Sequence, residues 1–411
     1  MSQATRILIA LVAGLLIGTA GSFWYPKLAI GATALTQPVG SAWLHGLQMV
    51  IVPLIIGLLV TGVAAAADAA RAGRIALRAM IAFVAILWSV TLMSALLVPV
   101  LLDLWPLPAA WAKAIRLGLT GTAPVGNVPS IASFFDSIVP QNIVAAASGD
   151  AFLPLTIFGL TFAFAVAKLP AEQRERLTAL FQAMTDALLI IIGWVLKLAP
   201  IGVFALAYGV GARTGASAFG ALIHYIVTVS PIGILVLLAA YPVAMIAGRV
   251  SLWRFARAAA PAQAVAVSTQ SSLASLPAML EATARLGAPP ATAGIVLPIA
   301  VAVFRATSPA MNLAVALYVA HLMGVPIGPA QIVAGVCTAA ITTMGSVSLP
   351  GTISFIASVA PVALAMGVPV EALGLLIAVE TIPDIFRTLG NVTMDMAVTV
   401  GIAKRTAVDP A

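Results

Sequence analysis

The sequence contains very little charge. Of 411 residues only 8% are charged, 20 basic and 13 acidic, whereas an ordinary soluble protein has roughly 25%. A soluble fold of this length needs a far larger charged surface, so a set of soluble domains is excluded. The formal net charge of +7 does not indicate nucleic acid as a partner, because the basic residues are few and scattered.

Cysteine is also nearly absent. The single Cys337 cannot form an internal disulfide, which excludes a small secreted disulfide scaffold. The alternation of polar and apolar residues that is typical of membrane β-barrels is missing. Instead, 62% of the residues are hydrophobic and the mean hydropathy is +1.12. We therefore expect an all-α protein that lies mostly in the lipid bilayer.

Continuous apolar runs predict the membrane-spanning helices. A span needs about 20 mainly apolar residues, and candidates in the first part of the chain are residues 7–24, 43–65, 79–102, 154–167, 180–210 and 221–246. The first run is too long for a cleaved signal segment, so we expect it to be retained as a helix. The final span is expected at 372–405.

Three segments of the second half are interrupted by polar residues. Residues 252–285 break at 268–277, residues 329–371 break at 342–351, and the span between them breaks at 305–309. Irregular backbone at membrane depth is tolerated only where it is buried in protein or lines a cavity. We expect the two outer segments to be re-entrant hairpins, although Ser, Thr and Pro also occur as simple helix kinks.

The placement of basic residues supports this topology. With a cytoplasmic N-terminus and hairpins that return to their own side, the cytoplasmic connections hold Arg6, Arg71, Arg74, Arg78, Lys168, Arg174, Arg176, Arg249, Arg254, Arg257, Arg285, Lys404 and Arg405. The external connections hold only Lys27, Lys113, Arg116 and Arg213. This excess agrees with the positive-inside rule, and it predicts eight spans with both termini in the cytoplasm.

The paired interruptions also indicate a binding site. Half-helix N-termini present free N–H groups and partial positive charge, which suit an anionic substrate, and exposed carbonyl groups suit a cation. Such interruptions in corresponding parts of a chain are the usual pointer to the site of a secondary transporter.

The last span carries costly charges on one helix face. Asp384, Arg387, Asn391 and Asp395 recur at steps of three or four residues, and ionisable residues inside membranes usually face a pathway or a partner. Arg387 can bind a carboxylate bidentately. Asp384 can pair with Arg387 or hold an ammonium group, and Asp395 can coordinate a cation. The alternative is a self-neutralising salt-bridge network.

These residues carry a resemblance to a known family. Residues 384–395, DIFRTLGNVTMD, are similar to the D-x-x-R-T-x-x-N-V-x-x-D signature of the glutamate transporter family, the dicarboxylate/amino acid:cation symporters. Residues 345–351, GSVSLPG, resemble the second hairpin tip of that family, and 271–277, SSLASLP, its serine-rich first tip. The resemblance covers essentially the whole chain and includes the archaeal aspartate transporters.

The resemblance implies an elevator-type architecture of eight transmembrane helices and two re-entrant hairpins. Helices 1 and 2 (1–75) and helices 4 and 5 (105–215) would form the scaffold and the contacts of a homotrimer. Helix 3 (76–104) and residues 216–411 would form the moving transport domain, with helix 6, a hairpin at 252–285, helix 7 at 290–324, a hairpin at 329–371 and helix 8 at 372–405. The expected location is the inner (plasma) membrane of a bacterium or archaeon.

The family also implies the roles of individual residues. Arg387 would bind the side-chain carboxylate of the substrate, and Asp384 its α-ammonium group. The remaining implied contacts are Thr388, Asn391 and the backbone around Ser271, Ser272, Val347 and Leu349. Asp395, with Asn391, would be the residual site of a coupling cation. No cofactor is implied, and the coupling ion is H⁺ or Na⁺.

The sequence departs from the family in helix 7. The N-M-D-G-T motif falls on residues 304–308, FRATS, when the tip spacing is kept, and a shifted alignment on Ala316-Leu317-Tyr318 needs an insertion and supplies no aspartate. Arg305 would replace a sodium ion and pair with Asp395, anchor a second substrate carboxylate together with Ser308, or snorkel to the helix end.

These features predict secondary transport of aspartate or glutamate, with protons in place of the full sodium scheme. Glu380, Asp384 and Asp395 are the candidate proton carriers. A C4-dicarboxylate such as succinate, fumarate or malate is the second substrate class, because Arg305 adds positive charge. An anion channel is the competing functional class. The chain is not expected to be an enzyme, since the serine-rich tips have no base nearby in sequence.

Overall fold

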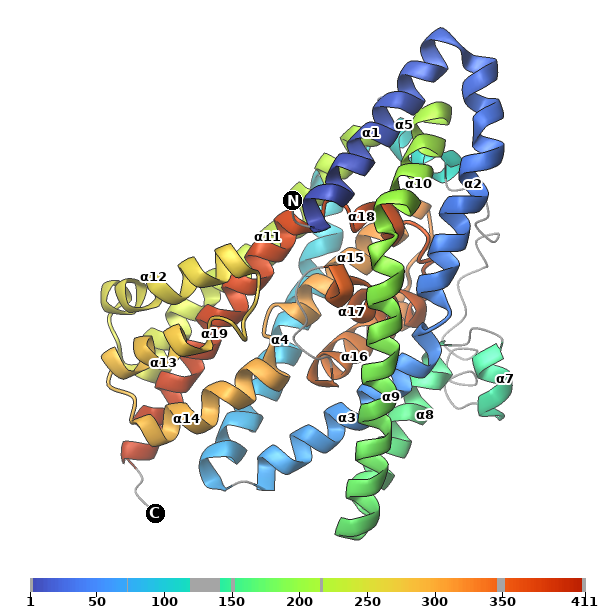
Figure 1. The fold of residues 1–411 in the computed structure, drawn as a ribbon. Coiled ribbons are helices and arrows are strands. Elements are labelled where there is room, and N and C mark those ends of the chain that lie inside the picture. The colour runs from blue at the N-terminus through green and yellow to red at the C-terminus, as the bar shows by residue number, and fades with distance from the viewer. Residues whose placement is uncertain are drawn as a thin grey trace.

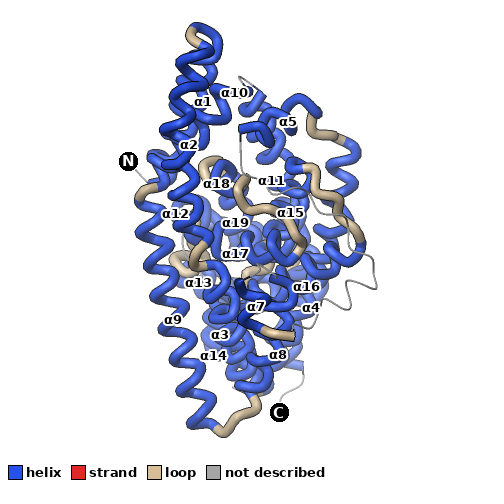
Figure 2. The backbone as a smooth tube through the Cα atoms, turned by 90° about the vertical axis from the view of Figure 1, so that its right-hand side faces the viewer, coloured by secondary structure: helices blue, strands red, loops and turns tan. Residues whose placement is uncertain are grey.

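The computed structural model describes residues 3–71, 73–118, 141–148, 152–214, 217–345 and 352–408. Every regular element in these ranges is a helix (Figures 1 and 2), which confirms the all-α expectation. Six helical stretches of the described part are long and apolar enough to cross a membrane. The elevator architecture and the count of eight spans stay predictions.

The first half of the chain is broken at prolines. Its helices are α1 (Gln3–Trp24), α2 (Pro26–Gln48), α3 (Ile51–Arg71), α4 (Arg74–Leu104), α5 (Ala109–Gly118), α7 (Ile143–Ser148), α8 (Phe152–Ala167), α9 (Ala171–Lys197) and α10 (Ala199–Thr214). The run expected at 180–210 is two helices that meet at Leu198. Pro200 has no N–H to donate to the carbonyl of Leu196, which interrupts the helix there. Pro53 acts in the same way between α2 and α3.

The second half contains the expected interruptions. Its elements are α11 (Ser217–Gly248), α12 (Leu252–Thr269), α13 (Leu276–Arg285), α14 (Pro290–Ile299), the π-helical η1 (Ala300–Phe304), α15 (Ser308–Met323), α16 (Pro329–Gly345), α17 (Thr352–Ala365), α18 (Leu373–Leu376) and α19 (Thr381–Val408). Helices α12 and α13 form the first hairpin. Helices α16 and α17 form the arms of the second, whose tip, with Val347 and Leu349, lies outside the described residues.

The final span differs from its predicted course of 372–405. It begins with the short α18, turns, and continues as α19 from Thr381. Pro383 lies in the first turn of α19, where a missing N–H costs nothing because that group has no helical partner. Glu380 lies in the turn that precedes α19, so the regular geometry of α19 does not determine the direction of its side chain.

The helices pack in two groups that meet along the second hairpin. Helix α10 packs on α1 and α2, and α3 packs on α8 and α9; in the other group α19 packs on α11, and α15 on α4. The first hairpin contacts α11, α14 and α19 and lies at the left of Figure 1, away from α9 and α10. The second hairpin contacts α15 of one group and α3, α8 and α9 of the other.

Helices α11 and α19 approach each other closely through glycine. A Cβ atom on Gly401 would lie 2.9 Å from the Cβ of Ala247, and one on Gly248 would lie 2.9 Å from Val400 Cγ1. This contact holds α19 against the rest of its group and thereby positions the charged face.

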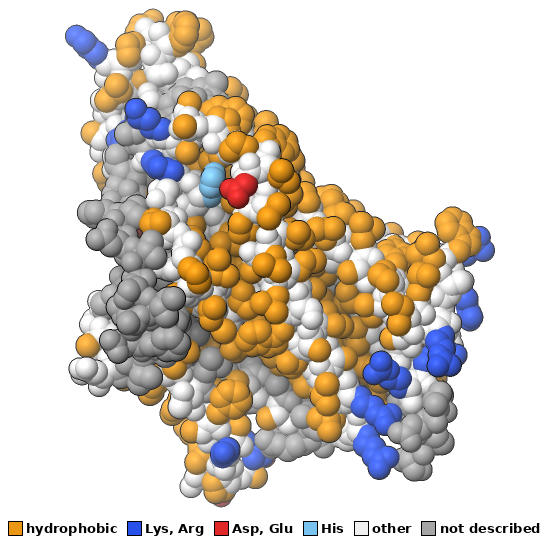
Figure 3. All heavy atoms as spheres, turned by 180° about the vertical axis from the view of Figure 1, so that it is seen from behind, with side chains coloured by type: hydrophobic (Ala, Val, Ile, Leu, Met, Phe, Trp, Pro, Cys, Tyr) orange, Lys and Arg blue, Asp and Glu red, His pale blue; other side chains and the backbone are white. Residues whose placement is uncertain are grey.

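On the face of the molecule seen in Figure 3, hydrophobic side chains cover the middle of the surface, and Lys and Arg gather at its lower right edge.

Candidate functional site

Arg387 is the centre of a buried polar cluster. It lies on α19 with 2% of its surface exposed, and its Nη2 atom is 2.6 Å from Glu380 Oε1. Its Nη1 group donates to Asn312 Oδ1 of α15 at 3.1 Å, and its Nε atom is 3.6 Å from Asp384 Oδ1. Two carboxylates and an amide therefore compensate a cation that would be costly to bury alone.

Glu380 is held from two sides. One carboxylate oxygen pairs with Arg387, and the other accepts a hydrogen bond from the Tyr225 hydroxyl of α11. The Tyr225 ring meets Tyr318 edge to face with centroids 5.2 Å apart, and the Tyr318 hydroxyl donates to the Ala221 carbonyl at 2.7 Å. Glu380 is thus bound to the cluster although the turn around it is irregular.

The break in helix 7 is tied to α19. The Thr307 N–H donates to Asn391 Oδ1 at 2.8 Å, and the Thr307 hydroxyl donates to the Arg387 carbonyl at 2.5 Å. A Cβ atom on Gly390 would lie 2.2 Å from Thr307 Cγ2, so only glycine admits this approach. The break therefore positions Arg387 through its backbone. It falls at residues 305–307, within the interruption predicted at 305–309.

Arg305 lies in this break and belongs to the cluster. Its backbone is left-handed, with φ of 35°, its side chain is buried, and it interacts electrostatically with Asp384 and Arg387. Burial contradicts the snorkelling alternative. A pair with Asp395 was one of the three alternatives for Arg305. It is not formed in this structure, where no described residue donates a hydrogen bond to the Asp395 carboxylate.

Asp395 is buried without a hydrogen-bond donor. Both of its carboxylate oxygens, the Ser308 hydroxyl and the Asn312 Nδ2 group are buried, and none has a hydrogen-bond partner among the described residues. A buried carboxylate in this condition is expected either to carry a proton or to meet a cation. In the described ranges, no group of three or more His, Cys, Asp or Glu side chains is placed so that it could hold a metal ion. A cation at Asp395 would therefore meet one carboxylate together with neutral oxygen donors.

The tip of the first hairpin lies against the start of α19. Gln270 has a left-handed backbone, with φ of 50°, and its Nε2 group donates to the Thr381 carbonyl at 3.2 Å. Ser272 is buried, and the Ser271 hydroxyl accepts a hydrogen bond from the Ala274 N–H at 3.2 Å. The predicted contacts at this tip therefore lie close to α19, which also carries the buried Thr388.

Tyr225 and Asn312 were not predicted, and the sequence predicted Glu380 as a proton carrier rather than as a partner of Arg387. Asn312 is an uncharged polar residue in an apolar run, seven residues after Arg305, and this was the available signal. No signal in the sequence indicates Tyr225, because its contact with Glu380 joins residues 155 positions apart.

Ser358 of α17 donates a hydrogen bond to Asn312 Oδ1 at 3.3 Å and thereby connects the second hairpin to the cluster.

The similarity to known proteins covers nearly the whole chain. The profile of the sodium:dicarboxylate symporter family matches residues 4–405. The proton/glutamate-aspartate symporter of Escherichia coli (strain K12) is 29% identical, over 98% of this chain and 92% of that protein. A proton/sodium-glutamate symport protein of Bacillus subtilis (strain 168) is 26% identical, over 98% and 92%. A C4-dicarboxylate transport protein of Deinococcus radiodurans is 25% identical, over 98% and 89%.

Proposed function

The chain belongs to the sodium:dicarboxylate symporter family, and on that premise we propose that it moves aspartate and glutamate across the membrane together with protons. Membership makes it a multi-pass membrane protein for secondary transport of acidic substrates. It is a transporter and not an enzyme, and symport draws on ion gradients instead of a cofactor. The amino-acid substrate, the proton coupling and the elevator movement are our proposals.

The Arg387–Glu380 pair is the observation that carries proton coupling. Glu380 occupies one side of the Arg387 guanidinium at 2.6 Å, where a substrate carboxylate would also bind. A carboxylate that enters this position displaces Glu380, which is then buried without its cation. Protonation of Glu380 removes the cost of that isolated charge. Substrate and proton would thus bind together, with Asp384 and Asp395 as further candidate carriers.

Asp384 supports an amino-acid substrate. Its carboxylate lies beside Arg387 on the same face of α19, where it would hold the α-ammonium group while Arg387 binds the distal carboxylate. Thr388, Asn391 and the first hairpin tip at Ser271 and Ser272 would supply polar contacts. The names of the relatives from Escherichia coli and Bacillus subtilis include glutamate, which agrees with this substrate class.

Arg305 supports a second candidate, transport of a C4-dicarboxylate. Its side chain is close enough to Asp384 and Arg387 for electrostatic interaction, so it would neutralise Asp384 and leave Arg387 for one carboxylate and itself, with Ser308, for another. The relative from Deinococcus radiodurans is a C4-dicarboxylate transport protein. Replacement Arg305→Met is expected to weaken succinate binding more than aspartate binding if this candidate is correct.

The two groups of helices support an elevator movement. The second hairpin lies between them and packs on α3, α8 and α9, so it would slide along that surface while α4, α11, α15 and α19 move as one transport domain. The scaffold helices would form the contacts of a homotrimer in the inner membrane. The unpartnered oxygens of Asp395, near Asn391, would hold a coupling cation if a sodium site remains.

Competition in reconstituted vesicles tests the substrate. Purified protein is assayed for uptake of labelled aspartate, with unlabelled succinate or glutamate as competitor and with or without sodium. The proposal predicts saturable uptake that glutamate inhibits more strongly than succinate. Stronger inhibition by succinate would replace it with the dicarboxylate alternative, and an ohmic current without saturation would indicate a channel.

A further inference from the structure

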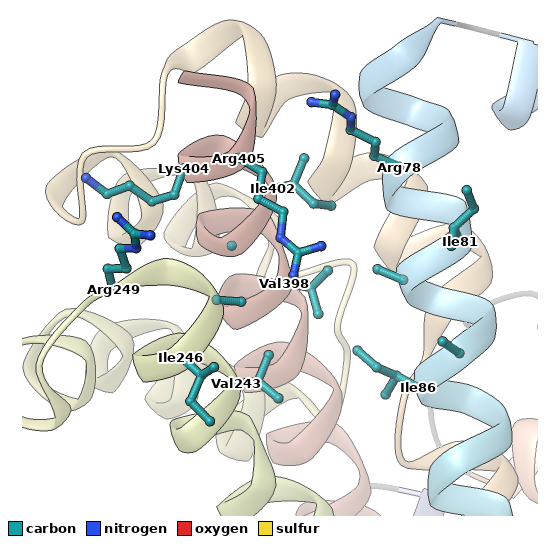
Figure 4. A pocket seen from close by; sticks show the side chains of 14 residues that line it. Arg78, Ile81, Ile86, Val243, Ile246, Arg249, Val398, Ile402, Lys404 and Arg405 are labelled. Atoms are coloured by element: carbon teal, nitrogen blue, oxygen red, sulfur yellow. The ribbon is translucent and has the colours of Figure 1, made fainter. Parts of the chain in front are cut away.

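A groove lies at one end of the molecule, away from the Arg387 cluster. It has a volume of about 930 Å³ and is formed by α4, α11 and α19, as Figure 4 shows. Its walls are apolar and include Ile86 of α4, Val243 of α11, and Val398 and Ile402 of α19. Lys404 at its mouth is 17 positions after Arg387 in α19, about 25 Å along the helix axis.

Basic side chains surround one end of this groove. Arg78 comes from the first turns of α4, Arg249 from the residue after α11, and Lys404 and Arg405 from the end of α19. None of the lining residues is acidic. The positive-inside distribution places all four on the cytoplasmic side, so three separate helices bring positive charge to one position at that membrane surface.

The groove opens toward the outer, lipid-facing surface of the helices. Ile81 and Ile246 line it with exposed fractions of 62% and 80%, which suit contact with acyl chains. Its floor is the tight contact of α11 and α19 at Gly401 and Ala247. From Arg78 to Ile86 the wall rises by about 12 Å, less than half of the roughly 30 Å hydrocarbon core, so the groove lies within one leaflet.

We propose that this groove binds an anionic phospholipid of the cytoplasmic leaflet. An acyl chain would lie between α4 and the α11–α19 pair, and the headgroup phosphate would lie among the four basic side chains. Guanidinium groups bind phosphate oxygens bidentately, and basic pockets between membrane helices are a known kind of headgroup site. This site is independent of the transported substrate and of the coupling ion.

Charge and polarity together select this ligand class. Inorganic phosphate would satisfy the cations but would leave the apolar walls unused. A zwitterionic phospholipid would fill the walls, but its ammonium group would lie among four positive charges. A lipid with net negative charge is complementary to both parts of the groove.

Two variants separate the headgroup contacts from the chain contacts. The first is the triple change Arg249→Asn, Lys404→Gln and Arg405→Gln, in which Asn suits the left-handed backbone at 249, where φ is 51°. Arg78 is left unchanged in this variant because it has a further interaction, and its removal would therefore change more than the headgroup contacts. The second is Ala82→Trp, which fills the groove and keeps its charge. The control removes the same charge from the α8–α9 connection and the first turns of α9: Lys168→Gln, Arg174→Gln and Arg176→Gln.

The measurement is native mass spectrometry of the detergent-purified protein titrated with phosphatidylglycerol or phosphatidylethanolamine. We expect wild type and the control to retain phosphatidylglycerol in preference to phosphatidylethanolamine. We expect the triple variant to bind phosphatidylglycerol on the order of a hundredfold more weakly, and Ala82→Trp to lose it as well. Size-exclusion profiles confirm that each variant is folded.

Three results would overturn the proposal. Equal retention of the two lipids by wild type would show a groove without headgroup selectivity. An equal loss in the control and the triple variant would show a general effect of net charge. Displacement of phosphatidylglycerol by millimolar inorganic phosphate, with no effect of Ala82→Trp, would show an anion site without an acyl-chain contact.

Discussion

At the scale of single residues, the buried cation Arg387 is compensated by partners that a substrate carboxylate could replace, whereas the buried Asp395 has no hydrogen-bond partner among the described residues. Arg387 contacts Glu380, Asp384 and Asn312. Removal of one member of a buried ion pair usually costs about 3–5 kcal/mol, so any substrate that separates Arg387 from Glu380 must replace the lost interaction. In our proposal, the substrate carboxylate replaces Glu380 as the partner of Arg387, and a proton neutralises Glu380.

Replacement Glu380→Gln should uncouple transport from protons. The amide cannot carry a proton through the cycle, so accumulation driven by a pH gradient should fall at least about tenfold, while exchange of internal for external aspartate persists. Glu172→Gln is the control, because it makes the same chemical change in an exposed pair with Arg176. Gradient-driven accumulation at the wild-type level in Glu380→Gln would exclude Glu380 as the carrier.

Replacement Tyr225→Phe should alter the pH dependence of uptake. The phenol donates to Glu380 and stabilises the ionised carboxylate, so without it Glu380 takes up a proton more readily and the uptake profile should shift to higher pH. Tyr318→Phe is the matched control, since it removes a neighbouring hydroxyl that donates to the Ala221 carbonyl rather than to Glu380. For Tyr318→Phe we expect a stability loss of about 1 kcal/mol and an unshifted uptake profile. Identical profiles for both variants would contradict it.

At the scale of helices, the interruptions position the site. The break at Arg305 and Thr307 is bound to α19 by two hydrogen bonds, and the first hairpin tip is bound to α19 by Gln270. Helix α19 is therefore the common support of the helix-7 break and the first hairpin. Small displacements between these elements change the contacts of Arg387 directly.

Gly390→Ala tests the contact between the break and α19. The added Cβ would lie 2.2 Å from Thr307 Cγ2, so the break must move, at a cost of about 1–3 kcal/mol, and uptake should be lost. Gly294→Ala in α14 is the control, because its added Cβ meets no atom within 4 Å. Thermal unfolding and aspartate uptake are measured for both. Wild-type uptake in Gly390→Ala would show that the contact does not position Arg387.

The sequence was informative wherever local chemistry determines the backbone. Prolines and polar runs predicted the first hairpin and the break before α15, and the spacing along α19 predicted that Asp384 and Arg387 share a face. The partners of Arg387 depend on tertiary packing instead. Tyr225 and Asn312 come from other helices, and Glu380 reaches Arg387 because α18 and α19 are separate. The interruption at Leu198 was also missed, since Pro200 alone has many possible effects.

At the scale of the whole molecule, the charges separate into two populations. Most basic residues are expected on the cytoplasmic side, where four of them border the groove of α4, α11 and α19, and the Arg387 cluster lies inside. This distribution predicts the orientation of the protein in the membrane. It places the proposed lipid groove in the cytoplasmic leaflet, and it predicts that the first hairpin enters from the cytoplasmic side. The second hairpin packs between the two helix groups, and this is the surface along which we propose that the transport domain moves.

Cysteine labelling tests this orientation. Leu273 in the first hairpin tip is 57% exposed, and Leu273→Cys in a Cys337→Ser background should react with a membrane-impermeant maleimide from the cytoplasmic side. Lys27→Cys at the start of α2 should react from the external side only. Inside-out and right-side-out vesicles distinguish the two faces. Reaction of both cysteines from one face would contradict the topology.

The most direct test of proton-coupled transport is uptake of labelled aspartate by purified protein in vesicles under separately imposed gradients. The account predicts concentrative, saturable uptake when the interior is alkaline and sodium is absent, and no additional accumulation when a sodium gradient is added. Uptake that follows the sodium gradient and ignores the pH gradient would contradict it.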